Sequence, residues 1–354
     1  MAYTTIDDPS AHFQTVLYTG NASDGHAITF DGNSDLQPDW VWIKPRSFAG
    51  WHVSTDTSRG LTKNVYPNDT YQEETNTTRI QSMNSDGFTI NNDADTINKS
   101  SQTIVAWAWK ANGGTRTTNT ESGDNPAGGY QANTTAGFSI VDWTGTGGAG
   151  GLMAHGLGAV PHTIITKTRS HANSWAVYHH RNTAAPETDY LKLDSTAATL
   201  DNVNRWNDTV PTSTNLVFGD VGGVNGNDQT QIAYVFTEKQ GYSKFGSYTG
   251  NGNADGPFIY LGFKPAWAVF KNTTSGHSWR ILDNRRNTHN SNNTDLRPDV
   301  PDAESSSSDM DFLSNGIKMR DTDGDLNEDG SNHVYMAFAE HPFVSSKGIP
   351  TTAR

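Results

Sequence analysis

The sequence predicts an all-β protein built from three repeated antiparallel β-sandwiches of a jelly-roll-like kind, with long polar loops. Three observations support this fold class. A short pattern recurs three times, the apolar residues gather in short runs between Gly, Asn, Asp, Thr and Ser, and helical periodicity is nearly absent. Aromatic residues make up 10% of the 354 residues although only 33% are hydrophobic. Because disordered chains are depleted of aromatics, this composition excludes disorder.

The recurring pattern has the same parts in each copy. An aromatic-Thr-Gly triplet is followed by a proline, a strand-like run, a lysine six residues after the proline, and a tryptophan seven or eight residues later. The triplets begin at Tyr18, Trp143 and Tyr248, the lysines are Lys44, Lys167 and Lys271, and the tryptophans are Trp51, Trp175 and Trp279. Each copy closes with an apolar, aromatic-rich strand (IVAWAWK, IAYVFTE or VYMAFAE). Repeats of this length are whole small domains, so we expect an array and not one catalytic domain with insertions.

The copies divide the chain. We predict an N-terminal arm, three sandwiches separated by one linker or long surface loop, and a C-terminal tail, at residues 1–12, 13–110, 111–136 (the linker), 137–243, 244–343 and 344–354. The linker is rich in Gly, Thr and Asn and has almost no apolar periodicity. The arm has no core of its own, and such termini commonly order against a partner.

The strands of a sandwich are clearest in the third copy. FGSY alternates, PFIYLGF and AWAVFK are dense in β-formers, WRILD alternates, DFLSNGIKMR reads as a hairpin around Ser-Asn-Gly, and HVYMAFAE is the most apolar run. These segments cover residues 245–248, 257–263, 266–271, 279–283, 311–320 and 333–340. Seven short strands in about 100 residues are typical of a β-sandwich.

Charge and composition exclude several classes of partner. The formal net charge is −13, from 25 basic and 38 scattered acidic residues, and such a surface repels a phosphate backbone. There is no cysteine, so disulfides and thiol sites are excluded. The start, MAYTTIDDPS, does not read as a signal peptide, and no run approaches the roughly 20 apolar residues of a membrane span. We therefore expect synthesis in a cytoplasm, no nucleic-acid binding and no membrane insertion.

Catalytic patterns are absent from the sequence. It contains no GxSxG elbow, no HExxH spacing and no phosphate loop, and its histidines are mostly dispersed. Glu73, Glu74 and Glu304 lie in polar loops, but the second copy has no clear counterpart, which argues against a shared catalytic role. We expect a protein that is not an enzyme.

Two loops hold the candidate binding residues. DTDGDLNED, residues 321–329, places Asp321, Asp323 and Asp325 at alternate positions, which suits Ca²⁺, although Gly324 departs from the EF-hand spacing. The alternative is a turn-rich, solvated connection without a metal. Trp206 stands in the polar loop NVNRWNDTVP and is the tryptophan best placed to stack on a sugar, with a packed loop anchor as the alternative. The other tryptophans are expected in the core.

Long segments of the chain resemble one family. PDWVWIKPRS, SDGFTINNDADTIN, TIVAWAWKANGG, TAGFSIVDWTGTG, KFGSYTGNGNADGPFIYLGFKPAWAVFK and YMAFAEHPF are similar to tailed-phage virion structural proteins, which are common in viruses of marine bacteria. The resemblance spans nearly the whole chain. It implies a virion location, assembly with other virion proteins as a homo-oligomer, a trimer or higher, and no established catalytic residues.

The resemblance leads to three expectations for function. The first is a tail-fibre, tail-tip or capsid-mounted protein that contacts host surface glycans, attached to the particle through residues 1–12. The second is a tail-associated polysaccharide depolymerase, which needs a carboxylate pair in a cleft. The third is a structural spacer or capsid decoration protein without a ligand.

Overall fold

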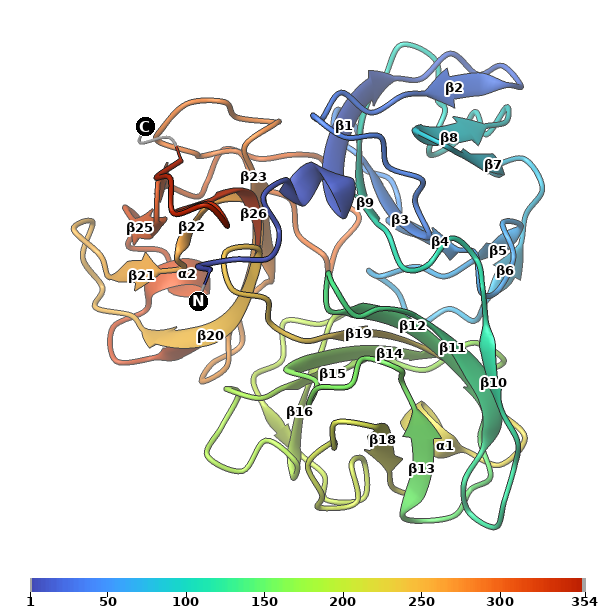
Figure 1. Cartoon of the computed structure of the whole chain (residues 1–354). Coiled ribbons are helices and arrows are strands. Elements are labelled where there is room, and N and C mark those ends of the chain that lie inside the picture. Colours follow the sequence, from blue (N-terminus) through green and yellow to red (C-terminus); the bar gives the residue numbers. More distant parts are fainter. Residues whose placement is uncertain (1, 352–354) are drawn as a thin grey trace.

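The computed structural model describes residues 2–351 and confirms the all-β prediction. Three lobes lie around a common centre (Figure 1). We refer to residues 13–110 as lobe 1, 111–237 as lobe 2 and 243–342 as lobe 3. Helical segments in the described residues are short, at η1 (Pro9–Ala11), α1 (Gly222–Asn225) and α2 (Gly324–Asn327). None of the helices in this part of the chain is long and apolar enough to cross a bilayer.

Each lobe has a main sheet with the same strand order. In lobe 1 the order is β1 (Phe13–Thr19), β9 (Thr103–Trp109), β3 (Trp40–Pro45), β4 (Val53–Asp56). In lobe 2 it is β12 (Phe138–Thr144), β19 (Thr230–Phe236), β14 (Thr163–Thr168), β15 (Ala176–His179). In lobe 3 it is β20 (Ser243–Thr249), β26 (Asn332–Pro342), β22 (Phe263–Asn272), β23 (Arg280–Asp283). All neighbouring strands are antiparallel. Of the four strands named for each main sheet, the one that comes last in the sequence lies between the two that come first.

A smaller sheet covers the outer face of each main sheet. These sheets are β2 (His26–Ile28), β8 (Gly87–Ile90), β7 (Ile80–Asn84) in lobe 1, β13 (Gly151–Ala154), β18 (Asn215–Phe218) in lobe 2, and β21 (Phe258–Tyr260), β25 (Gly316–Met319), β24 (Met310–Leu313) in lobe 3. Lobe 1 adds the pair β5 (Lys63–Asn64) and β6 (Glu74–Thr75), and lobe 2 extends its main sheet with β16 (Asp189–Lys192) and β17 (Leu200–Asp201). Each lobe thus encloses its own sandwich core.

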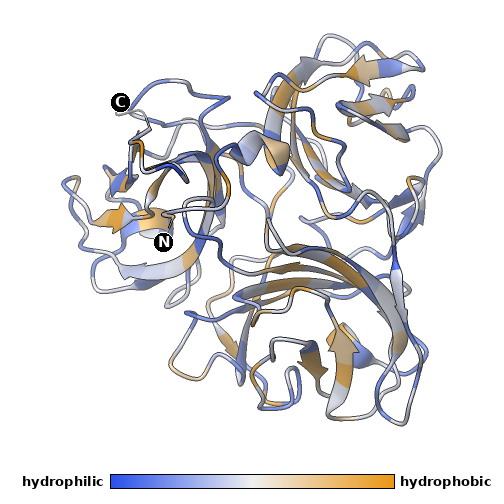
Figure 2. Cartoon of the chain, viewed as in Figure 1, coloured by the Kyte–Doolittle hydropathy of each residue, from blue (hydrophilic) through white to orange (hydrophobic). Residues whose placement is uncertain are grey.

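The inner faces of the three main sheets share a fourth core. Along β9, Ile104, Ala106 and Ala108 point into the sandwich core of lobe 1, while Trp107 and Trp109 point to the centre. This central core gathers residues of all three lobes, among them Trp40, Trp42, Trp107, Trp109, Ile165, Trp175, Tyr234, Phe236, Trp267, Trp279, Met336 and Phe338. Figure 2 shows hydrophobic segments along the strands of all three lobes. Because both faces of each main sheet are buried, the lobes form one packed body and not separate beads.

The stretch 111–136 differs from the predicted linker. It forms β10 (Thr117–Asn119) and β11 (Ala127–Asn133), and β11 pairs along the whole length of β12. Gly128 lies so close to the neighbouring strand that a Cβ would stand 2.1 Å from the carbonyl oxygen of Asp142. The glycines that made the segment look like a loop allow this close approach.

The N-terminal arm makes contacts within its own chain. The described part of residues 1–12 packs against lobe 3 of the same chain, where the Tyr3 hydroxyl donates to the carbonyl of Gly262 at 2.7 Å. Asp7 accepts from the backbone N–H of Ser346 at 2.6 Å, so the tail folds over the arm. The arm therefore orders against its own chain and joins lobe 1 to lobe 3. Residue 1 of the predicted arm and residues 352–354 of the predicted tail lie outside the described residues.

Candidate functional site

The three repeated lysines lie at the contacts between lobes, which we call seam 1–2, seam 2–3 and seam 3–1. Each lysine is fully buried. Its Nζ donates to a carbonyl of its own lobe and to one of the preceding lobe: Lys167 to Asn173 and Thr70, Lys271 to His277 and Thr196, Lys44 to Gly50, Pro301 and Asp302. Burial lowers the pKa of Lys44 to about 7 and the pKa values of Lys167 and Lys271 to about 8. The recurring lysine therefore joins two lobes through hydrogen bonds to backbone carbonyls of both.

The residue eight positions after each lysine follows the same cyclic order, in which each lobe bonds the lobe before it and lobe 3 counts as the lobe before lobe 1. Its ring nitrogen bonds a carbonyl of the preceding lobe: Trp175 to Tyr66 at 2.7 Å, Trp279 to Lys192 at 2.8 Å, His52 to Arg297 at 2.9 Å. The predicted counterpart in the first copy, Trp51, is wrong by one residue and is 38% exposed. The spacing in the sequence did not reveal this, because a tryptophan directly precedes the histidine that makes the cross-lobe hydrogen bond.

A polar network lies at each seam, with charged members at two of the three. Seam 1–2 has Asp56, Arg59, Glu73 and Arg169, and seam 3–1 has Asp283, Arg286, Glu304 and Arg46. At seam 2–3 the same places hold His179, Asn182, Thr199 and Thr273, and Thr199 bonds Asn182 at 2.7 Å. All four positions change from charged to neutral together, so that none of these charges is left without a counter-charge at the seam.

Ion pairs with arginines explain the loop carboxylates whose role the sequence left undecided. Glu73 forms a two-pronged ion pair with Arg169 at 2.7 and 3.0 Å, and Glu304 pairs likewise with Arg46 at 2.8 and 2.9 Å. Glu74 pairs with Arg79 at 3.1 Å. Each of the three carboxylates is thus engaged by an arginine.

The outer part of seam 1–2 is filled by β11. Gln131 is fully buried there, and its amide donates to the hydroxyls of Ser58 at 2.6 Å and Thr57 at 3.1 Å. Thr57 and Ser58 directly follow β4, and the residues that follow β15 and β23 border the other two seams.

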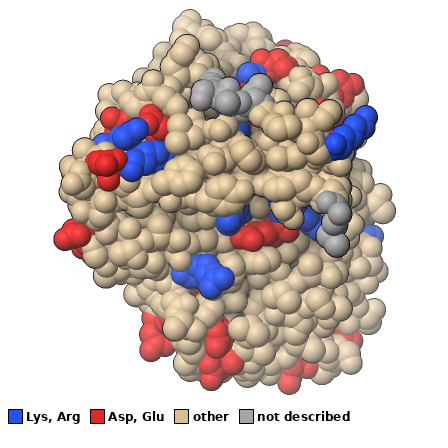
Figure 3. All heavy atoms as spheres, turned by 60° about the vertical axis from the view of Figure 1, so that its left-hand side comes forward, with Lys and Arg blue, Asp and Glu red and all other residues tan. Residues whose placement is uncertain are grey.

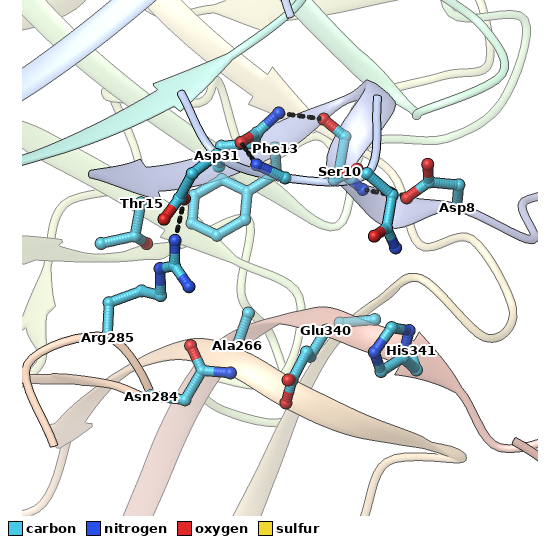
Figure 4. Close-up of a pocket in the computed structure, with 14 residues that line it drawn as sticks. Asp8, Ser10, Phe13, Thr15, Asp31, Ala266, Asn284, Arg285, Glu340 and His341 are labelled. Carbon is cyan, nitrogen blue, oxygen red and sulfur yellow. Dashed lines mark hydrogen bonds and ion pairs between the residues drawn. The ribbon is translucent and has the colours of Figure 1, made fainter. Parts of the chain in front are cut away.

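The outer part of seam 3–1 is a polar cavity of about 180 Å³ between β1 and lobe 3. Figure 4 shows Asp31 and Arg285 reaching toward one another across it, and they form an ion pair. Glu340, on the lower wall, pairs with Lys264. The charged groups of this cavity are therefore compensated by other groups of the same chain.

Seam 2–3 is open along β20. Two adjoining hollows of about 450 and 460 Å³ share Glu238, Lys244 and Tyr260, and we call them together the β20 groove. Its lining includes Tyr260, which is 50% exposed, and Phe258, which is 46% exposed, from lobe 3, and Arg181 from lobe 2. Figure 3 shows lobe 3 from its outer side, where small groups of acidic and basic side chains lie in a mostly uncharged surface.

Hydrogen bonds fix the floor of the β20 groove. The Phe245 N–H donates to the Glu238 carboxylate at 2.8 Å, and His180 Nε2 donates to the Phe245 carbonyl at 2.7 Å. His162 Nδ1 accepts from the N–H of Glu238 at 3.1 Å. Burial lowers the pKa values of His162 and His180, so both rings are neutral at pH 7. These bonds use the floor groups and leave the wall groups to face solvent.

The acidic loop 321–329 brings together two of its three proposed Ca²⁺ ligands. Ligand atoms of Asp323, Asp325 and His277 lie within 4.8 Å of one another, and Asp321 is not part of this group. Arg280 pairs with Asp325 at 2.5 Å and with Asp323 at 3.5 Å. Asp323 also caps α2 by accepting from the N–H of Asp325. Arg280 therefore supplies the positive charge that a cation would supply, and the loop's acids have structural partners.

Trp206 is not available to a sugar. It is 1% exposed, its Nε1 donates to the carbonyl of Asp189 at 3.0 Å, and its ring packs edge-on against Tyr178. The sequence instead missed Phe258 and Tyr260, which lay inside the apolar run PFIYLGF and looked like core. Their signal was the period of two, because Ile259 between them is buried.

Comparison with known proteins gives a family but no named relative. No curated protein matches the chain. A family model described as "Domain of unknown function (DUF7483)" matches residues 8–342, which include all three lobes. The chain therefore belongs to the DUF7483 family.

Proposed function

We propose that this chain is a non-catalytic glycan-binding protein on the surface of a bacteriophage particle, and that the β20 groove is its binding site. The observation that carries the proposal is the pair of exposed aromatic side chains, Phe258 and Tyr260, in a groove that Arg181 also lines. The phage setting rests on the sequence resemblance described above. A groove with aromatic faces and a few oriented polar groups is the usual form of a small-molecule or saccharide site.

The spacing of the two rings suits an extended ligand. Phe258 and Tyr260 are two residues apart on β21, so their side chains lie on the same face, about 7 Å apart along the strand. Ile259 points the other way and anchors the strand in the core of lobe 3. Two aromatic faces on one strand can contact successive rings of a polysaccharide.

The groove is held rigid by buried contacts between its two walls. His179 Nε2 contacts the carbonyl of Tyr335 at 3.1 Å across seam 2–3, and Trp279 and Lys271 bond carbonyls of lobe 2. A site whose walls are fixed before binding loses little conformational entropy when a ligand enters. This favours recognition of a repeating, extended glycan by a preformed surface.

Binding of the labelled full chain to intact marine bacteria and to immobilised polysaccharides from their surface tests the proposal. Wild-type protein is expected to bind saturably, and Tyr260→Ala to weaken binding at least about tenfold, the loss of one well-packed aromatic contact. Tyr71→Ala is the matched control, because Tyr71 is 51% exposed and lies in lobe 1.

Three outcomes would contradict the proposal. An equal loss of affinity in Tyr71→Ala and Tyr260→Ala would show that the groove is not the binding site. Failure to bind any cell or polysaccharide would favour a spacer or decoration protein. Release of soluble reducing ends from a bound polysaccharide would show a depolymerase.

A further inference from the structure

We infer that the β20 groove selects anionic glycans, which carry carboxylate or sulfate groups, over neutral ones. This inference rests on the proposed function, because it names the ligand class of the same groove.

The first argument is the local charge. The chain has a net charge of −13, yet the groove is lined by Arg181 and Lys244 from opposite lobes and by one acid, Glu238. The Glu238 carboxylate already accepts the N–H of Phe245. With both groove histidines neutral, the groove presents two cations against one engaged carboxylate. A basic surface on an otherwise acidic protein attracts anions, whereas the acidic remainder of the surface repels them.

The second argument comes from the same position at the three seams. Ser58, Arg181 and Arg285 each lie two residues after the last residue of β4, β15 and β23, and those last residues share one register position. Ser58 is met by the amide of Gln131 from β11. Arg285 is met by the carboxylate of Asp31, as Figure 4 shows. Within residues 2–351, Arg181 has no ion-pair partner.

The ion pair of Asp31 with Arg285 therefore indicates which kind of group can pair with Arg181. At seam 3–1 the chain itself supplies a carboxylate to the guanidinium at the mouth of the cavity. At seam 2–3 that place is open to an external group, and a guanidinium binds carboxylate and sulfate-like oxyanions through paired N–H donors.

The third argument is the position of Lys244. Its Nζ lies 5.5 Å from the centre of the Tyr260 ring, so the cation and the exposed aromatic face form one surface. A sugar on Tyr260 that carries an acidic substituent can meet Lys244 beside it, and Arg181 lines the same hollow. Neutral sugars gain only the aromatic contact.

The test measures affinity of the full chain for four polymers of matched length: polygalacturonate, its methyl ester, sulfated dextran and dextran. We expect an anionic polymer to bind at least about tenfold more tightly than its neutral counterpart, and this advantage to shrink as salt rises. Arg181→Gln and Lys244→Gln are each expected to weaken anionic binding about three- to tenfold, as for partly exposed ion pairs.

Lys99→Gln is the matched control. Lys99 is exposed on lobe 1 and also lies over an aromatic ring, that of Phe48 at 4.5 Å, so the substitution removes the same charge and the same type of contact away from the groove. It is expected to leave all four affinities unchanged.

The outcomes separate the two proposals. Loss of binding on methyl esterification assigns carboxylate, binding of sulfated dextran alone assigns sulfate, and both support the inference. Equal binding of neutral and anionic polymers, with Tyr260→Ala still reducing both, overturns the anion preference and keeps the glycan site. Equal effects of Lys99→Gln and Arg181→Gln also overturn it. No binding of any polymer by the wild-type chain removes both proposals.

Discussion

Arg59 offers the sharpest test of how the lobes are held together. Its side chain is fully buried and pairs with the fully buried Asp56 at 2.6 Å and with Glu73 at 3.2 Å, and it donates to the hydroxyl of Tyr234 in lobe 2 at 3.2 Å. Arg59→Met removes one partner and leaves the Asp56 carboxylate buried without a counter-charge. Breaking a buried pair in this way costs about 3 to 5 kcal/mol of unfolding free energy.

Urea denaturation at pH 7 measures this loss without screening the ion pairs. Asn182→Ala is the control, because Asn182 has the corresponding place in the neutral network and accepts a single 2.7 Å bond from Thr199. Its loss is expected to cost about 1 to 2 kcal/mol. The double variant Asp56→Asn with Arg59→Met should be more stable than Arg59→Met alone, since it removes the orphaned charge. A loss in Arg59→Met no larger than that in Asn182→Ala would refute the reasoning.

Three further predictions concern pH, the core and the acidic loop. Burial lowers the pKa of His179 to about 3, whereas the unfolded side chain titrates near 6.5, so the unfolded chain takes up the proton first. Stability should therefore fall by up to about 1.4 kcal/mol per unit as pH drops from about 6.5 toward 3, and the urea midpoint of His179→Gln should depend less on pH; equal slopes would contradict this. Trp206→Ala should cost about 3 to 5 kcal/mol in urea and leave glycan affinity of the folded protein unchanged, whereas lost affinity at full stability would restore a ligand role. Asp323→Ala should lower the free energy of unfolding by about 1 kcal/mol through loss of the α2 cap, and Ca²⁺ or a chelator should leave the melting temperature unchanged; a Ca²⁺-dependent rise that Asp323→Ala abolishes would show a metal site.

The sequence was informative about local structure because strand periodicity is local. The all-β class follows from runs such as VYMAFAE, whose alternate residues face two different cores. The run AGGYQAN was missed because its two glycines hide the period of two, although β11 is a full-length strand. The place of His52 was missed because Trp51 precedes it, and only its bond to Arg297 reveals the correct position.

The candidate site was harder to predict because its parts come from distant segments. Lys44 bonds carbonyls 257 and 258 residues away, and no local pattern announces such a partner. The β20 groove forms only when lobe 2 and lobe 3 come together, because Arg181 of lobe 2 and Tyr260 of lobe 3 line the same hollow. Trp206 was selected for its polar sequence neighbours, but a polar loop can still fold its tryptophan inward, and the bond to Asp189 does so.

The central core joins three sandwiches that belong to one polypeptide, and this changes the molecularity of assembly. If three separate chains met around such a core, the folded form would depend on protein concentration and would dissociate on dilution. Here the second and third lobes meet the first at the high effective concentration that a covalent connection provides. We therefore expect that the three lobes stay together on dilution and that the melting temperature does not depend on concentration through this core.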